Sequence, residues 1–216
     1  DVHRMQLTGG TITRHLGTSP IDLHANGEYF LSLFIRSGTD GSDAGSQEFI
    51  DVDLVSGSST PIAFGVGSNE NFAINLSGSP AVSSIADALA IDTTYLLLAK
   101  IDVGSAGSDQ VELAWFDDPE DLPTNESEIA WQLSKTGNLS GIIDSIRIEG
   151  GSNAVWNIDA LRIGSTFDSV IFTDGVVPEI LGDLTADGQI TILDWHALKA
   201  NYGFDTSALT IPEQQD

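Results

Sequence analysis

The chain has 216 residues, of which 32 are acidic and 8 are basic, so its formal net charge is −24, and it contains no cysteine. A surface this acidic repels phosphate backbones and anionic membranes, which excludes nucleic acid as a partner, and the lack of cysteine excludes disulfides, thiolate zinc sites and cysteine nucleophiles. No stretch approaches the ~18 consecutive apolar residues of a membrane span, and no signal peptide is visible.

Short apolar or alternating runs, separated by Gly, Ser, Asn and Asp, recur through the first 171 residues. Eight of these runs predict β-strands: 28–37, 48–56, 61–68, 71–78, 94–104, 110–118, 141–151 and 155–167. Residues 83–90 are typical of one or two helical turns beneath a sheet. Strands at this spacing predict a mainly β fold, an antiparallel β-sandwich that occupies residues 1–173.

The two-residue period is clear in the run 141–151. Alternation places four side chains on one face: Ile142, Asp144, Ile146 and Ile148. The opposite face takes Ile143, Ser145 and Arg147. Residues 48–56 alternate in the same way, so Asp51 and Asp53 are expected on one face of their strand.

The pattern changes near residue 174. Gly175 and Pro178 interrupt residues 174–181, which predicts a linker. Residues 182–204 then combine an Asp-rich loop with a short helix, and residues 205–216 form a polar tail. The fold class is therefore a β-sandwich followed by a small EF-hand-like loop and helix.

The loop has the spacing of a calcium site, with Asp183 as its first position. Oxygen donors converge on the ion as the chain curls, glycine at the sixth position allows the sharp turn, and a carboxylate at the twelfth closes the sphere. An Asp-rich turn with Asp194 as a helix N-cap is the alternative. The predicted Ca²⁺ ligands are Asp183, Thr185, Asp187, Gln189, Thr191 and Asp194.

The stretch GDLTADGQITILDWHALKANYG (182–203) resembles one repeat of a type I dockerin, the calcium-binding module of cellulosomes and of many bacterial surface proteins. Dockerins usually carry two repeats, and this chain has one. The tenth and eleventh loop positions, which in cellulosomal dockerins are small hydroxyl residues that contact cohesin, are Ile192 and Leu193. These apolar residues argue against cohesin binding and favour packing against the sandwich or a neighbouring copy.

Residues 13–37, 64–74, 94–119 and 158–171 together resemble concanavalin A-like or LamG-like jelly rolls of secreted planctomycete-type bacterial proteins. Members of this superfamily often bind sugars, and some are glycoside hydrolases. The resemblance implies that the domain usually starts further upstream. We therefore expect one or two opening strands to be missing, which would leave a sheet edge for another chain to complete.

A hydrolase would need two carboxylates beside the scissile bond, and the candidates are Asp51 and Asp53, with Glu48 nearby. The alternative is an acidic strand face exposed to solvent. A sugar-binding module would need exposed aromatic rings, for which the candidates are Trp115, Trp131 and Trp156, with Trp115 favoured as a core residue. The histidines do not cluster at ligand or triad spacing: His3, His15, His24 and His196.

These observations favour a non-catalytic, calcium-stabilised extracellular or cell-surface protein with a structural or adhesive role. The chain begins at Asp1 without methionine, so we expect a mature or trimmed product. Copies could associate through open sheet edges or through apolar residues of the C-terminal segment: Ile192, Leu193, Leu209 and Ile211. A carbohydrate-binding module with a polysaccharide partner is the alternative, and a concanavalin-like glycoside hydrolase is the lesser one.

Overall fold

A computed structural model of the chain describes residues 5–38, 49–67, 70–77, 82–84, 89–90, 92–104, 109–118 and 121–171, without the side chains of residues 153 and 154. These residues belong to one compact unit, His3–Ile171. The predicted linker 174–181, the calcium loop and helix 182–204 and the tail 205–216 lie outside the described residues. No helix in the described part is long and apolar enough to cross a membrane.

Ten strands of the described part form one continuous sheet in the order β10-β9-β8-β3-β12-β4-β5-β6-β7, with β1 paired to β12. Every pairing is antiparallel, and two short strands, β2 and β11, form a separate pair. The strands are β1 Met5–His15, β2 Ile21–Asp22, β3 Gly27–Ser37, β4 Ile50–Ser56, β5 Ser59–Val66, β6 Phe72–Leu76, β7 Val82–Ser83, β8 Thr94–Val103, β9 Asp109–Phe116, β10 Leu133–Gly137, β11 Ile142–Ile143 and β12 Ser145–Gly164. Two 3₁₀ turns complete the elements, η3 Glu126–Glu128 and η4 Phe167–Ser169.

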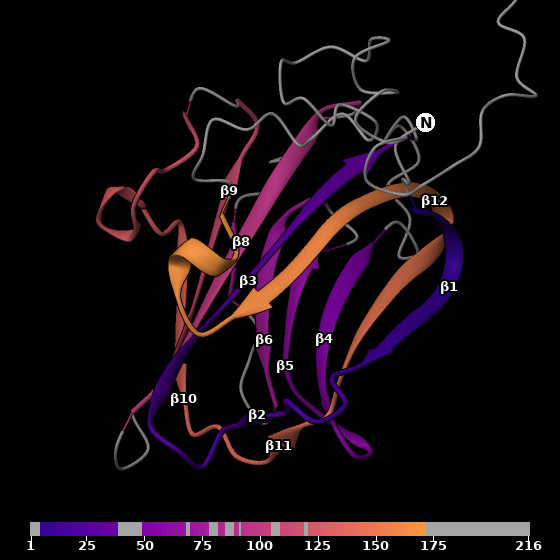
Figure 1. The fold of residues 1–216 in the computed structure, drawn as a ribbon. Helices are drawn as coiled ribbons and strands as arrows, with labels where there is room; N and C mark the ends of the chain where they lie inside the picture. The colour runs from indigo at the N-terminus through magenta and orange to yellow at the C-terminus, as the bar shows by residue number, and fades with distance from the viewer. Residues whose placement is uncertain are drawn as a thin grey trace, which may run out of the picture. The chain divides into compact units, whose positions relative to one another are not determined.

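The long strand β12 joins the two halves of the sheet. Residues 145–150 pair with β4, and residues 156–164 pair with β3, so the 20-residue strand belongs to both halves. β1 pairs with β12 along both parts, and the two strands bend together (Figure 1). The bend brings the halves face to face, which makes the predicted jelly-roll sandwich from a single folded sheet.

The main core lies between the two halves. Alternate residues of β4 and β5 are fully buried there, among them Val52 and Phe64, as a two-residue period requires. The ring of Phe72 on β6 stacks on Trp115 of β9, with centroids 4.2 Å apart, and meets Tyr95 of β8 edge-on at 5.5 Å. These contacts join the halves across the core, where Trp115, favoured as a core residue, is half-buried and packs against the buried cluster.

A second core covers the other face of β3, β8 and β9. Phe30 and Leu98 lie there beneath η4, whose Phe167 meets Phe30 edge-on with centroids 6.3 Å apart. The buried Ser32 hydroxyl donates a hydrogen bond to the Val170 carbonyl oxygen at 2.5 Å and ties this segment to the sheet. Because β8 is buried on both faces, its sequence is a continuous apolar run rather than an alternating one.

All eight predicted strands are present, but the predicted bounds of 141–151 and 155–167, and the predicted alternation of the first, are wrong. Residues 145–164 form one strand, whereas two were predicted, and the alternation fails at Ile142, which is 50% exposed while Ile143 is fully buried. The interruption lies at Asp144, whose N–H donates to the Val55 carbonyl and whose carboxylate accepts from the Gly57 N–H at 2.9 Å. This residue separates β11 from β12 and shifts the side-chain phase by one.

The sequence did not predict β1, because most of its residues are polar or glycine and Leu7 is its buried side chain. Gly9 and Gly10 have positive φ angles of 68° and 92° where the register with β12 shifts. β1 pairs antiparallel with β12 along both parts of that strand. The short strands β2, β7 and β10 were also not predicted, and Ser83, predicted to start a helical turn, lies in β7.

Gly65 is required by the close approach of β5 to β4. A Cβ atom at this position would lie 2.0 Å from the Ile50 carbonyl oxygen, so the backbone would have to move. We expect Gly65→Ala to lower the free energy of unfolding by about 2–3 kcal/mol, measured by urea denaturation. Gly27→Ala is the control, because its Cβ would meet Tyr29 at an ordinary 3.7 Å. Equal effects of the two substitutions would contradict this reading of the β4–β5 contact.

Candidate functional site

Several predicted site residues lie outside the described residues, so their positions remain sequence predictions. They include the calcium ligands, one of the three candidate catalytic carboxylates and two of the histidines: Asp183, Thr185, Asp187, Gln189, Thr191, Asp194, Glu48, His3 and His196.

The remaining candidate carboxylates lie in a patch formed by Asp51 and Asp53 of β4 with Arg147 and Glu149 of β12. The register places Asp51 directly opposite Glu149 and Asp53 directly opposite Arg147. All four side chains project from the face of the sheet opposite the main core. The prediction that Asp51 and Asp53 share a face is therefore confirmed, and β12 supplies the neighbours that sequence spacing could not identify. We call these four residues the acidic patch.

An ion pair occupies the centre of the acidic patch. Arg147 donates to Asp53 Oδ2 from Nε at 2.8 Å and from Nη2 at 2.5 Å, and Nη2 also lies 3.4 Å from Thr60 Oγ1. The Asp53 side chain is only 8% exposed, so Arg147 compensates a carboxylate that has lost most of its water. The hydrogen bonds and negative charge of Asp53 raise the pKa of Arg147. The Asp53 carboxylate is thus held by Arg147.

Asp51 is the chemically unusual member of the acidic patch. Burial, followed by the negative charges of Asp53 and Glu149, raises its pKa to about 6, while the charge of Arg147 acts in the opposite direction. A carboxyl group with this pKa could donate a proton near neutral pH. Its other cross-strand neighbour is Gly65, which provides no side chain to wall a substrate cleft.

The described residues contain no group of three or more His, Asp or Glu side chains arranged to hold a metal ion. His24 Nδ1 lies 3.1 Å from Asp22 Oδ1 at an exposed turn, and His15 ends β1, so these two histidines do not form a cluster. Among the described residues, the acidic patch is an ion-pair network.

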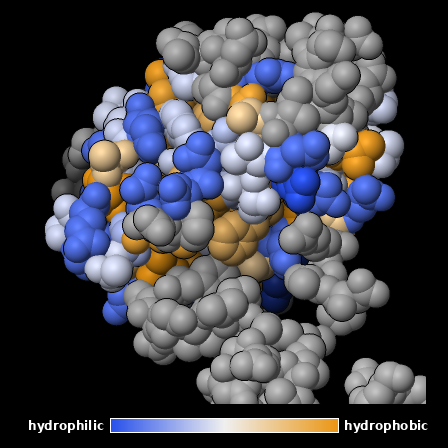
Figure 2. Space-filling view, turned by 90° about the horizontal axis from the view of Figure 1, so that it is seen from above, coloured by the Kyte–Doolittle hydropathy of each residue, from blue (hydrophilic) through white to orange (hydrophobic). Residues whose placement is uncertain are grey.

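The three candidate tryptophans face the interior to different degrees. Trp156 is 1% exposed, and Trp115 packs against Phe72. Trp131 is half-buried and packs on the second core. Among the described residues Ile142 is the one exposed large hydrophobic side chain. On the face shown in Figure 2, hydrophilic residues are interspersed with smaller groups of hydrophobic ones.

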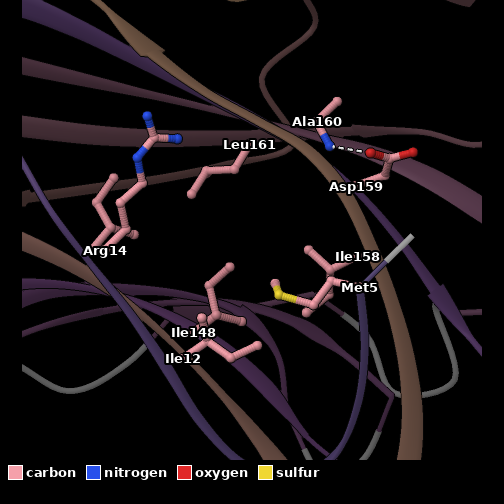
Figure 3. Close-up of a pocket in the computed structure, with 9 residues that line it drawn as sticks. Met5, Ile12, Arg14, Ile148, Ile158, Asp159, Ala160 and Leu161 are labelled. Atoms are coloured by element: carbon pink, nitrogen blue, oxygen red, sulfur yellow. Dashed lines mark hydrogen bonds between the residues drawn. The ribbon is translucent and has the colours of Figure 1, made fainter. Parts of the chain in front are cut away.

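A pocket of about 290 Å³ lies where β1 and β12 bend (Figure 3). Most of its walls are aliphatic, and one cation and one carboxylate line it as well. Sequence analysis missed this pocket because its walls come from distant positions that only the bend brings together. Its lining residues are Met5, Ile12, Arg14, Ile146, Ile148, Ile158, Asp159, Ala160 and Leu161.

No protein-family model matches the chain, and no curated protein matches it. Among solved structures, the chain is similar to an endo-β-1,4-glucuronan lyase from the fungus Trichoderma reesei, with a TM-score of 0.51, 10% identity, and coverage of 79% of this chain and 78% of the lyase. Sheep galectin-11 matches with a TM-score of 0.41 and 8% identity over 73% of this chain and 98% of the galectin. Basic winged bean lectin matches with a TM-score of 0.43 and 8% identity over 65% of this chain and 74% of the lectin. At this identity the likeness to the lyase establishes the concanavalin A-like jelly-roll fold and nothing about activity.

The raised pKa of Asp51 gives stability a specific pH dependence. The folded chain holds this proton more tightly than the unfolded chain, where the pKa takes its ordinary value of 3.8, so ionisation costs stability as the pH rises from 3.8 through about 6. We expect Asp51→Asn to stabilise the protein by roughly 2 kcal/mol at pH 8 and by little at pH 4.

Urea denaturation of the wild type and of Asp51→Asn across this pH range measures the difference. Asp117→Asn, at an exposed aspartate just beyond β9, controls for replacing aspartate by asparagine at the surface. If the difference in stability between the wild type and Asp51→Asn stayed constant with pH, ionisation of Asp51 would not be the cause of the pH dependence.

Proposed function

We propose that the protein is a non-catalytic, calcium-stabilised extracellular or cell-surface protein with a structural or adhesive role. The sequence supports this proposal through its net charge of −24, which suits a salty or extracellular medium, and through the oxygen-donor spacing of residues 183–194. The fold supports it because Asp53, which a hydrolase would need, and the tryptophans, which a sugar-binding module would need, make contacts within the protein.

The observation that carries the proposal is the ion pair between Arg147 and Asp53. A glycoside hydrolase needs one carboxyl group that donates a proton and a second that stays free to act as base or nucleophile. Asp51 has a pKa suited to the first role, but Asp53 is held by two hydrogen bonds from Arg147. The pair that sequence spacing suggested is therefore better suited to joining β4 to β12 than to hydrolysis.

The carbohydrate-binding alternative needs an aromatic side chain that a sugar ring can stack on. Trp156 is buried in the main core, while Trp115 and Trp131 are half-buried and pack on the main and second cores. The second core also covers the outer face of β3, β8 and β9. Among the described residues, these contacts favour a structural role over sugar binding by stacking.

The finer proposal is that copies of the chain associate through a sheet edge or through the C-terminal segment. Among the described residues β1 pairs only with β12, so its other edge presents backbone N–H and C=O groups. The eleven residues of β1 include no acidic side chain in a chain that has 32. This edge would therefore repel an acidic second copy less than the rest of the surface does.

Calcium should raise the stability of the protein. Six oxygen donors of residues 183–194 would hold the ion, and saturation at 100 times Kd adds about 2.7 kcal/mol if the unfolded chain does not bind. We expect calorimetry to give a higher unfolding temperature with Ca²⁺ than with a chelator, and Asp187→Ala to remove most of the difference. Asp205→Ala, outside the loop, should keep it. Unfolding temperatures that do not respond to calcium would argue against the metal site.

The non-catalytic role predicts an absence of turnover. We expect the wild type to release no reducing ends from β-glucans at pH 5–8, and a glycan array to show no binding that depends on Trp131. The pH range brackets the pKa of about 6 of Asp51, so a general acid would be detected. Turnover that Asp51→Asn and Asp53→Asn both abolish would overturn the proposal in favour of a hydrolase.

A further inference from the structure

We propose that the pocket at the bend of β1 and β12 binds a free aliphatic carboxylate, a small molecule with a hydrocarbon chain and one anionic end. The site uses none of residues 182–204, so the inference is independent of the proposed function. The pocket volume of about 290 Å³ is close to the lower end of the range for small-molecule sites, roughly 300–1,000 Å³.

The walls select an aliphatic group. Ile146, Ile148 and Ile158 of β12 are buried in the main core and form one side, while Met5 and Ile12 of β1 are half-buried. Among the described wall residues none is aromatic, and only Arg14 and Asp159 carry polar side-chain groups. A sugar would lose hydrogen bonds to water here without regaining them, whereas a hydrocarbon chain gains by leaving water.

The charge at the rim selects an anion. Arg14 pairs with Ile146 through its backbone, and its exposed side chain makes no hydrogen bond or ion pair with another described side chain. Figure 3 shows its guanidinium at one side of the pocket and the Asp159 carboxylate at the other. Asp159 Oδ1 accepts a hydrogen bond from the Ala160 N–H at 2.7 Å, so it is turned toward its own backbone. The guanidinium is therefore available to a carboxylate, which it can bind through two parallel hydrogen bonds.

A bulge in β12 shapes the wall opposite β1. Ala160 has a φ of 50°, which is unfavourable for a residue other than glycine, and the pairing with β3 shifts between Asp159 and Arg162. The two residues between these positions, Ala160 and Leu161, have no partner in the β3 pairing and line the pocket. A regular strand would have continued the β3 pairing here, so the bulge helps to make the space.

The probe is octanoate, with 1-octanol as the uncharged comparison, each titrated into the full chain by calorimetry. Methyl NMR of the isoleucines and leucines locates the ligand. We expect saturable binding of one octanoate per chain, with shifts at Ile12, Ile148 and Leu161, and weaker binding of octanol. Arg14→Gln should weaken octanoate about tenfold, to the level of octanol, since it removes one charge-assisted contact.

Two control variants separate the pocket from general effects. Arg36→Gln removes a positive charge of β3 outside the pocket and should leave octanoate binding unchanged. Ile12→Trp fills the pocket and should abolish binding, whereas Thr13→Trp, at the next residue on the opposite face of β1, should not.

Three results would overturn the proposal. The first is no saturation by octanoate at millimolar concentrations, and the second is equal affinity of the wild type and Arg14→Gln. The third is a dimer in sedimentation velocity that Ile12→Trp disrupts and octanoate does not, because a second copy would then occupy the pocket.

Discussion

The two halves of the sheet are held together by one bent strand. β12 gives its first residues to the pairing with β4 and its last residues to the pairing with β3, and β1 follows it through the bend. Gly150 lies at the bend, where a Cβ atom would approach Leu7 Cδ2 to 2.9 Å. Because both halves share this strand, their apolar faces close on each other, the acidic patch points away from the core, and the pocket forms inside the bend.

Among the described residues, several side chains that could have carried chemistry make contacts within the fold. β3 and β8 are covered on both faces, Trp156 is buried between the halves, and the half-buried Trp115 packs against the main core. On the outer face of β4, Arg147 pairs with Asp53, while burial, followed by the negative charges of Asp53 and Glu149, raises the pKa of Asp51. The acidic patch thus combines an ion pair with one carboxyl group whose pKa is raised. The proposed non-catalytic role rests on this arrangement.

Local sequence patterns predicted the strands whose apolar residues follow one another in the chain. The apolar runs of β3 and β8 are long and bounded by turn residues, so their strands could be recognised from sequence. β1 was missed because its stability comes from pairing with β12 rather than from its own apolar residues. The partner of Asp53 is 94 residues away in sequence, and the pocket depends on the bend, so neither could be derived from spacing. The predicted calcium site, in contrast, could be derived from spacing, because all its predicted ligands lie within twelve consecutive residues.

The central claim is that this sandwich belongs to a calcium-binding protein, and counting bound metal tests it most directly. Native mass spectrometry of the full chain, exchanged into a volatile buffer with micromolar calcium, measures how many ions each chain retains. We predict one Ca²⁺ per wild-type chain and none when Asp183 and Asp194 are both replaced by alanine. A wild-type chain that retains no calcium, or a double variant that retains as much, would contradict it.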